Sequence, residues 1–135
     1  MGGFVMQFKR NEGFRFVFGE PLDGNYIILL DGKPAVLEQS RVECKIIDIS
    51  PRGMKITTET DFTQYTGQYV QLEMYFMLDM IQIKAIGEIV WSKNFGQKFQ
   101  YGLRFAQQSN LEDLVISELK ARRKREVAAS KMKKI

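Results

Sequence analysis

The segment Asp48-Ile49-Ser50-Pro51-Arg52-Gly53 contains the residues whose types and spacing are best suited to chemistry in this sequence. A carboxylate accepts hydrogen bonds from paired N–H donors, a hydroxyl donates and accepts, and a glycine lets a bound group approach the backbone. Arg10 and Arg15 add guanidinium groups, which grip phosphates in a forked geometry and stack on flat rings. The pattern indicates a site that binds a ligand rather than one that breaks a bond.

Composition excludes most catalytic alternatives. The 135 residues include no histidine, which removes histidine-based triads, histidine-ligated metals and histidine pH switches. The one cysteine, Cys44, can form no intramolecular disulfide and has no histidine to activate it, so we interpret it as a small residue in a strand. We therefore expect no enzymatic activity, no metal site and no cofactor.

Short strands separated by turn residues must position these groups. Phe14, Phe16 and Phe18 alternate with other residues, which is typical of a strand with one buried face. Similar patterns predict strands near 26–30, 35–37, 41–49, 54–58, 69–76, 81–91 and 99–105, with a bend at 19–24, a hairpin turn at Asp31-Gly32 and a loop at 92–97. The fold class is all-β: six or seven antiparallel strands forming a small barrel.

Details of the pattern predict local geometry. The buried phase switches between Ile46 and Ile47, which predicts a bulge or sharp bend before Ser50. Met74 and Phe76, like the phenylalanine stripe, are interpreted as core rather than as a surface for stacking bases. Trp91 is interpreted as barrel packing.

A C-terminal helix follows the barrel. Ser109 and Glu112 have the spacing of a capping box, and Asn110 is an alternative N-cap. Apolar side chains then recur at helical spacing as far as Leu119. We divide the chain into a barrel with an N-terminal arm, 1–110, and a basic helix, 111–135.

The excess positive charge lies in that helix. Residues 1–110 carry twelve basic and twelve acidic side chains, whereas residues 111–135 carry eight basic and four acidic ones. The 120–134 tail is suited to nucleic acid, an anionic membrane surface or an acidic partner. It lacks interleaved aromatics and a large apolar face, so we favour a solvated helix end, and nucleic-acid binding stays open.

Three segments together resemble the PilZ domain family, the bacterial receptors for cyclic diguanylate. Residues 48–53 match the family motif Asp/Asn-x-Ser-x-x-Gly, and Phe14-Arg15 with Pro21-Leu22 is similar to the strand entry after its arginine-rich loop. The segments 87–91 and 101–105 are similar to its two closing strands. The resemblance spans residues 9–105 and implies a split barrel and a non-enzymatic cyclic dinucleotide receptor.

The resemblance also implies roles for single residues. Asp48 would accept from a guanine edge, Ser50 would contact phosphate or base, and Gly53 would form a tight turn. The family's Arg-x-x-x-Arg motif is altered, because Arg10 and Arg15 are five positions apart and Asn11 stands where the first arginine is expected. Either a bulge at Gly13 restores Arg10 to the site, or one arginine clamp is lost.

The sequence therefore supports two functional hypotheses. In the first, cyclic diguanylate orders the arm (residues 9–15) against the 48–53 turn and changes binding to an unknown protein partner. In the second, the barrel is a degenerate PilZ-like interaction module that binds no nucleotide; Asp48 and Ser50 would then cap a turn, and Arg10 would be solvated. No signal peptide or membrane span is visible, so we expect a cytoplasmic protein.

Overall fold

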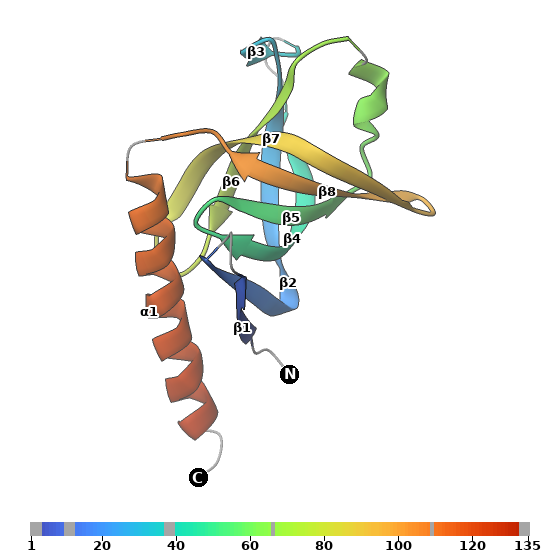
Figure 1. The fold of residues 1–135 in the computed structure, drawn as a ribbon. Helices are drawn as coiled ribbons and strands as arrows, with labels where there is room; N and C mark the ends of the chain where they lie inside the picture. Colours follow the sequence, from blue (N-terminus) through green and yellow to red (C-terminus); the bar gives the residue numbers. More distant parts are fainter. Residues whose placement is uncertain (1–3, 10–12, 37–39, 66, 109, 133–135) are drawn as a thin grey trace.

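A computed structural model describes residues 4–9, 13–36, 40–65, 67–108 and 110–132, with side chains from residue 15 onward (Figure 1). The elements in chain order are β1 (Phe4–Lys9), β2 (Gly13–Leu30), β3 (Lys33–Pro34), β4 (Val42–Ser50), β5 (Gly53–Thr58), the 3-10 helix η1 (Phe62–Tyr65), β6 (Val70–Met77), β7 (Gln82–Phe95), β8 (Lys98–Phe105) and α1 (Leu111–Met132).

Six antiparallel strands close into a barrel in the order β2-β4-β5-β8-β7-β6, with β6 pairing back to β2. β1 adds to the outer end of β2, and β3 pairs with the other end. β2 is 18 residues long, so it can pair with both β4 and β6 and close the barrel. The predicted bend at 19–24 is a register shift within this strand, between Val17 and Leu22. The predicted all-β barrel with a C-terminal helix is confirmed.

Alternation along the strands produces the core. In β6, Leu72, Met74 and Phe76 are buried and the residues between them are not, because successive side chains of a strand point to opposite faces of the sheet. Phe16, Phe18, Met74 and Phe76 belong to this core, as predicted, whereas the Phe14 side chain lies outside the described part. The predicted change of phase in β4 is a bulge at Ile47, since Ile46 pairs with Ile56 and Asp48 with Lys55.

Two predictions of local structure were wrong, and one strand was not predicted. The segment 92–97 is no loop: β7 and β8 continue as a hairpin and turn at Gly96, where φ is 61°. This hairpin is exposed on both faces, so no alternation marks it in the sequence. The return strand expected at 35–37 lies instead at Lys33–Pro34, as β3; residues 35–36 are bends, and Leu37 lies outside the described residues. β1 is the strand that was not predicted.

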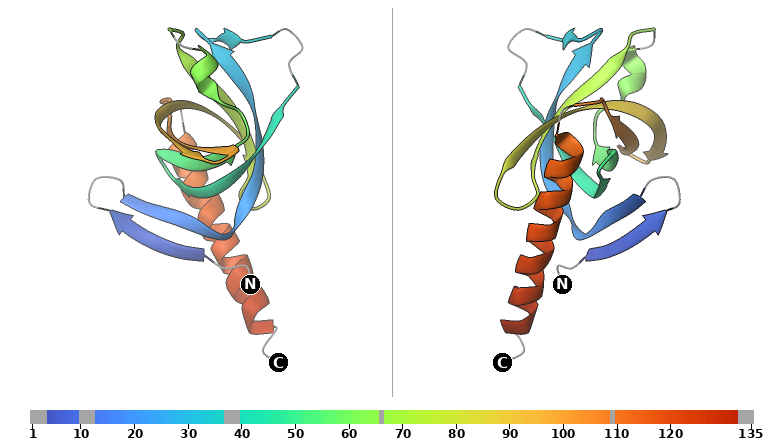
Figure 2. Two further views of the ribbon diagram at one scale, coloured as in Figure 1. Left: turned by 90° about the vertical axis from the view of Figure 1, so that its right-hand side faces the viewer. Right: turned by 60° about the vertical axis from the view of Figure 1, so that its left-hand side comes forward.

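The helix α1 packs along one side of the barrel (Figure 2). Leu111, Val115 and Leu119 join the core, as their spacing predicts. The Asn110 carbonyl accepts from the Leu114 N–H at 3.0 Å, and Ser109 of the predicted capping box lies outside the described residues. Within the described chain, no helix has the length and apolar character needed to cross a membrane.

Candidate functional site

A row of directly paired residues crosses five strands and assembles the candidate site. It runs through Val17 in β2, Asp48 in β4, Lys55 in β5, Gly102 in β8 and Trp91 in β7. Directly paired residues of antiparallel strands point to the same face of a sheet. The adjacent row is buried in the core, so this row lies on the outer face of the barrel.

Asp48 is the electrostatic centre of this face. Only 3% of the residue is exposed, and its Oδ2 lies 3.3 Å from Lys55 Nζ and 3.6 Å from Arg15 Nη1. A buried carboxylate is stable only when it is paired, and these two cations provide that pairing. Two cations therefore face this one carboxylate, and guanidinium and ammonium groups are the side chains that bind anions most strongly. The structure thus brings together Arg15 and Asp48, two of the predicted residues, with Lys55.

Ser50 and Gly53 form the turn between β4 and β5. Ser50 Oγ accepts from the Arg52 N–H at 3.3 Å and donates to the Gly53 carbonyl at 3.4 Å. The interpretation of Ser50 as a turn residue is therefore confirmed in its geometry. Asp48 makes its ion pairs across the sheet, to β2 and β5.

Gly53 is required for a reason that the sequence did not predict. Its φ is not positive, so the turn itself does not demand glycine. A Cβ at this position would lie 2.1 Å from the Leu103 carbonyl oxygen in β8. The Phe105 N–H also donates to the Arg52 carbonyl at 2.8 Å. Glycine therefore permits close contact between the turn and β8.

Trp91 packs on the barrel, as interpreted, but on its outer surface and not in the core. The residue is 43% exposed, and its indole covers Gly102, where a Cβ would lie 2.0 Å from the indole nitrogen. The indole therefore lies on the same outer face as Asp48. Sequence reasoning also missed Lys55, although its place between the buried residues Met54 and Ile56 marks it as outward-facing.

Comparison with models of known protein families shows which family the chain belongs to. A family model described as PilZ domain matches residues 28–119, more than half of the chain. The chain belongs to the PilZ domain family. PilZ domains generally bind cyclic diguanylate and are generally non-enzymatic. No curated protein and no solved structure gave a significant match to this chain.

The PilZ match includes Asp48, Ser50, Gly53 and Lys55 but begins after both arginines of the altered motif. Arg15 nevertheless reaches Asp48, because β2 runs beside β4. Lys9 and Gly13 are paired in the β1–β2 hairpin, and Arg10 lies in the segment between them, outside the described residues. The described part of the predicted arm is thus strand, and the role of Arg10 stays a prediction.

Other reactive groups lie away from this face. Burial raises the pKa of the Cys44 thiol to about 12, which leaves little thiolate near neutral pH. Among the residues that the structure describes, no group of three or more cysteine, aspartate or glutamate side chains is placed to hold a metal ion.

Proposed function

We propose that the outer face formed by Arg15, Asp48, Ser50 and Lys55 binds cyclic diguanylate, and that this PilZ domain acts as a non-enzymatic receptor or adaptor. The observation that carries the proposal is the buried Asp48 carboxylate held between two cations. Cyclic diguanylate combines two phosphates with two guanines, so a ligand site needs both cationic donors and a carboxylate acceptor.

Each group has a role that its chemistry supports. Arg15 and Lys55 offer charged N–H donors to phosphate, and Arg15 also suits the O6/N7 edge of guanine. The Asp48 carboxylate accepts from the N1 and N2 donors of guanine, which adenine does not offer together. Trp91 presents an exposed ring on the same face, where a base gains stacking energy.

In the adaptor mechanism, ligand phosphates draw Arg15 and the β1–β2 hairpin toward the 50–53 turn. Because β1 contacts the barrel through β2, a movement of this hairpin changes the surface that β1 shows to a partner protein. The partner is unknown, and we place the receptor in the cytoplasm of a bacterium.

Calorimetric titration with cyclic diguanylate tests the proposal. We expect saturable binding that Asp48→Ala weakens at least tenfold, because the variant loses the carboxylate that accepts charge-assisted hydrogen bonds. Asp23→Ala is the matched control, since Asp23 also pairs with a lysine, Lys45, but is exposed and lies in a different cross-strand row, with Lys45 and Thr57. Equal weakening by both variants, or cyclic diadenylate binding as tightly as cyclic diguanylate, would overturn the assignment.

The alternative is a PilZ-like interaction module without nucleotide, and the arginine spacing favours it. Loss of one bidentate arginine removes a strong contact, so Arg10→Ala discriminates between the two arrangements of the arm. A tenfold loss on Arg10→Ala means that Arg10 reaches the ligand. If the unmodified protein shows no heat of binding and no thermal stabilisation by excess ligand, the nucleotide hypothesis is excluded, and the alternative is left to be tested with protein partners.

A further inference from the structure

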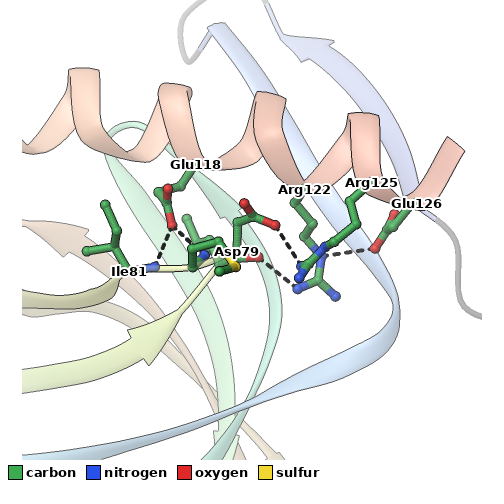
Figure 3. A network of polar contacts seen from close by, with 8 residues as sticks. Asp79, Ile81, Glu118, Arg122, Arg125 and Glu126 are labelled. Atoms are coloured by element: carbon green, nitrogen blue, oxygen red, sulfur yellow. Dashed lines mark hydrogen bonds and ion pairs between the residues drawn. The ribbon is translucent and has the colours of Figure 1, made fainter. Parts of the chain in front are cut away.

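The C-terminal half of α1 has two faces that differ in charge and in contacts. The inward face is held by the β6–β7 turn: Arg122 Nη1 donates to the Leu78 carbonyl at 2.9 Å, and Arg125 Nη2 lies 2.8 Å from Asp79 Oδ1 (Figure 3). Glu126 accepts from Arg122 Nε at 3.0 Å. These contacts fix the rotation of the helix about its own axis.

The opposite face is therefore turned away from the barrel. It carries cations around a small apolar centre and lines a shallow groove of about 510 Å³, formed by Lys120, Arg123, Lys124, Val127, Ala128 and Lys131. The positions recur at intervals of three and four, so they form one straight stripe along the helix. We call this stripe the outward face. Val127 is 44% exposed on it.

Charge on the outward face has one sign. The four cations are exposed, and the one acidic residue between Lys120 and Met132 is Glu126, which contacts Arg122 on the inward side. Residues 1–110 have equal numbers of basic and acidic residues. The family match ends at Leu119, so this stripe lies beyond the part shared with the PilZ model.

We propose that the outward face of α1 docks an acidic amphipathic helix of a partner protein. Val127 and Ala128 would contact apolar side chains, and the flanking cations would pair with carboxylates, as charged residues do beside a coiled-coil seam. A second copy of this chain does not fit, because Lys120, Lys124 and Lys131 would face like charges. The surface goes beyond ligand binding and does not depend on it.

Nucleic acid and membrane surfaces fit the same stripe less well. The apolar centre of the stripe would face phosphates in a complex with duplex DNA, and residues 1–110 carry no net charge that would add to the attraction. The stripe has no aromatic side chain for stacking on bases and too little apolar area for insertion between lipids.

Fluorescence anisotropy of the full chain with three labelled probes tests this proposal at about 0.15 M salt, where exposed charges are screened. The probes are a three-heptad helical peptide with leucine at a and d and glutamate at e and g, a duplex DNA, and vesicles containing phosphatidylglycerol. We expect the peptide to bind at least tenfold more tightly than the DNA and the vesicles. DNA or vesicles binding as tightly as the peptide would overturn the proposal.

Matched variants locate the contact. Converting Lys120, Arg123, Lys124 and Lys131 together to glutamine should weaken peptide binding at least tenfold. Converting the exposed barrel residues Lys33, Lys84, Lys93 and Lys98 to glutamine removes the same charge and should change it less than twofold. If both sets of glutamine variants weaken peptide binding equally, the contact is not on the outward face. If a peptide of the same composition, with its leucines scattered around the helix, binds as tightly, the docking is not specific for an amphipathic helix.

Discussion

At the scale of single residues, the Asp-x-Ser-x-x-Gly motif combines structural and binding roles. Ser50 and Gly53 shape the β4–β5 turn through Arg52 and Leu103, whereas Asp48 is paired with cations on two neighbouring strands. A serine or glycine variant that loses ligand can therefore lose it through the fold. Asp48 acts through ion pairs to neighbouring strands and not through the turn, so its replacement tests ligand binding once thermal unfolding has shown that the variant is folded.

Gly53→Ala should destabilise the barrel by about 1–3 kcal/mol, because the new methyl group would overlap the Leu103 carbonyl and force β5 and β8 apart. Urea unfolding followed by tryptophan fluorescence measures the loss, since Trp91 lies on Gly102 next to that strand pair. An unchanged midpoint would mean that the turn relaxes freely and that the close approach is not what requires glycine.

Only the site residues that belong to a local sequence motif could be predicted. Asp48 and Arg15 were identified because a motif and a strand entry mark them. Lys55 was missed and Trp91 was not placed beside Asp48, since their position there depends on the pairing register of five strands. The bulge at Ile47 was predicted from the change of hydrophobic phase, but the bulge between Ile89 and Trp91 was not, and it reverses the face of the residues that follow it.

At the scale of elements, α1 is attached to the barrel by a polar contact in addition to its apolar residues. Glu118 is only 6% exposed, and its Oε1 accepts from the Met80 and Ile81 N–H groups at 3.1 and 3.0 Å (Figure 3). The β6–β7 turn thereby satisfies its backbone donors through the helix. Arg122 also lies 5.1 Å from the ring of Phe18 in β2.

Glu118→Ala should therefore cost about 2–3 kcal/mol, because two backbone donors lose their acceptor. Glu112→Ala is the matched control on the same helix: its side chain is 61% exposed and its contact with Arg52 is 3.8 Å long, so the loss should stay below about 1 kcal/mol. Chemical unfolding of both variants makes the comparison. Similar losses for the two would mean that Glu118 is not the attachment point.

Elements with one buried face were predicted well, whereas the exposed β7–β8 hairpin and the added strand β1 were not. The alternation of Val70, Leu72, Met74 and Phe76 identified β6, and the spacing of Leu111, Val115 and Leu119 identified α1. The β7–β8 hairpin is exposed on both faces, so its strands carry no periodic signal. β1 is an added edge strand outside the closed barrel, and its existence depends on pairing with β2.

At the scale of the whole molecule, the cations of the two proposed surfaces form separate clusters, one on the barrel and one on α1. The proposed ligand face uses Arg15, Lys55 and Asp48 on the barrel, and the outward face of α1 holds the cations that make the chain basic. Arg122 joins these regions, since it sits on α1 and contacts Phe18, three residues from Arg15 on the same strand. The proposed ligand face and the proposed docking face are thus separate surfaces of the molecule.

The most direct test of the central proposal is a titration of the isotopically labelled full chain with cyclic diguanylate, followed by nitrogen–proton correlation spectra. We predict that the largest shifts fall on the backbone amides of residues 48–55 and 102 and on the indole N–H of Trp91. Saturation without shifts at these positions, shifts confined to Lys120–Lys131, or no shifts at any ligand concentration would contradict the proposed binding face.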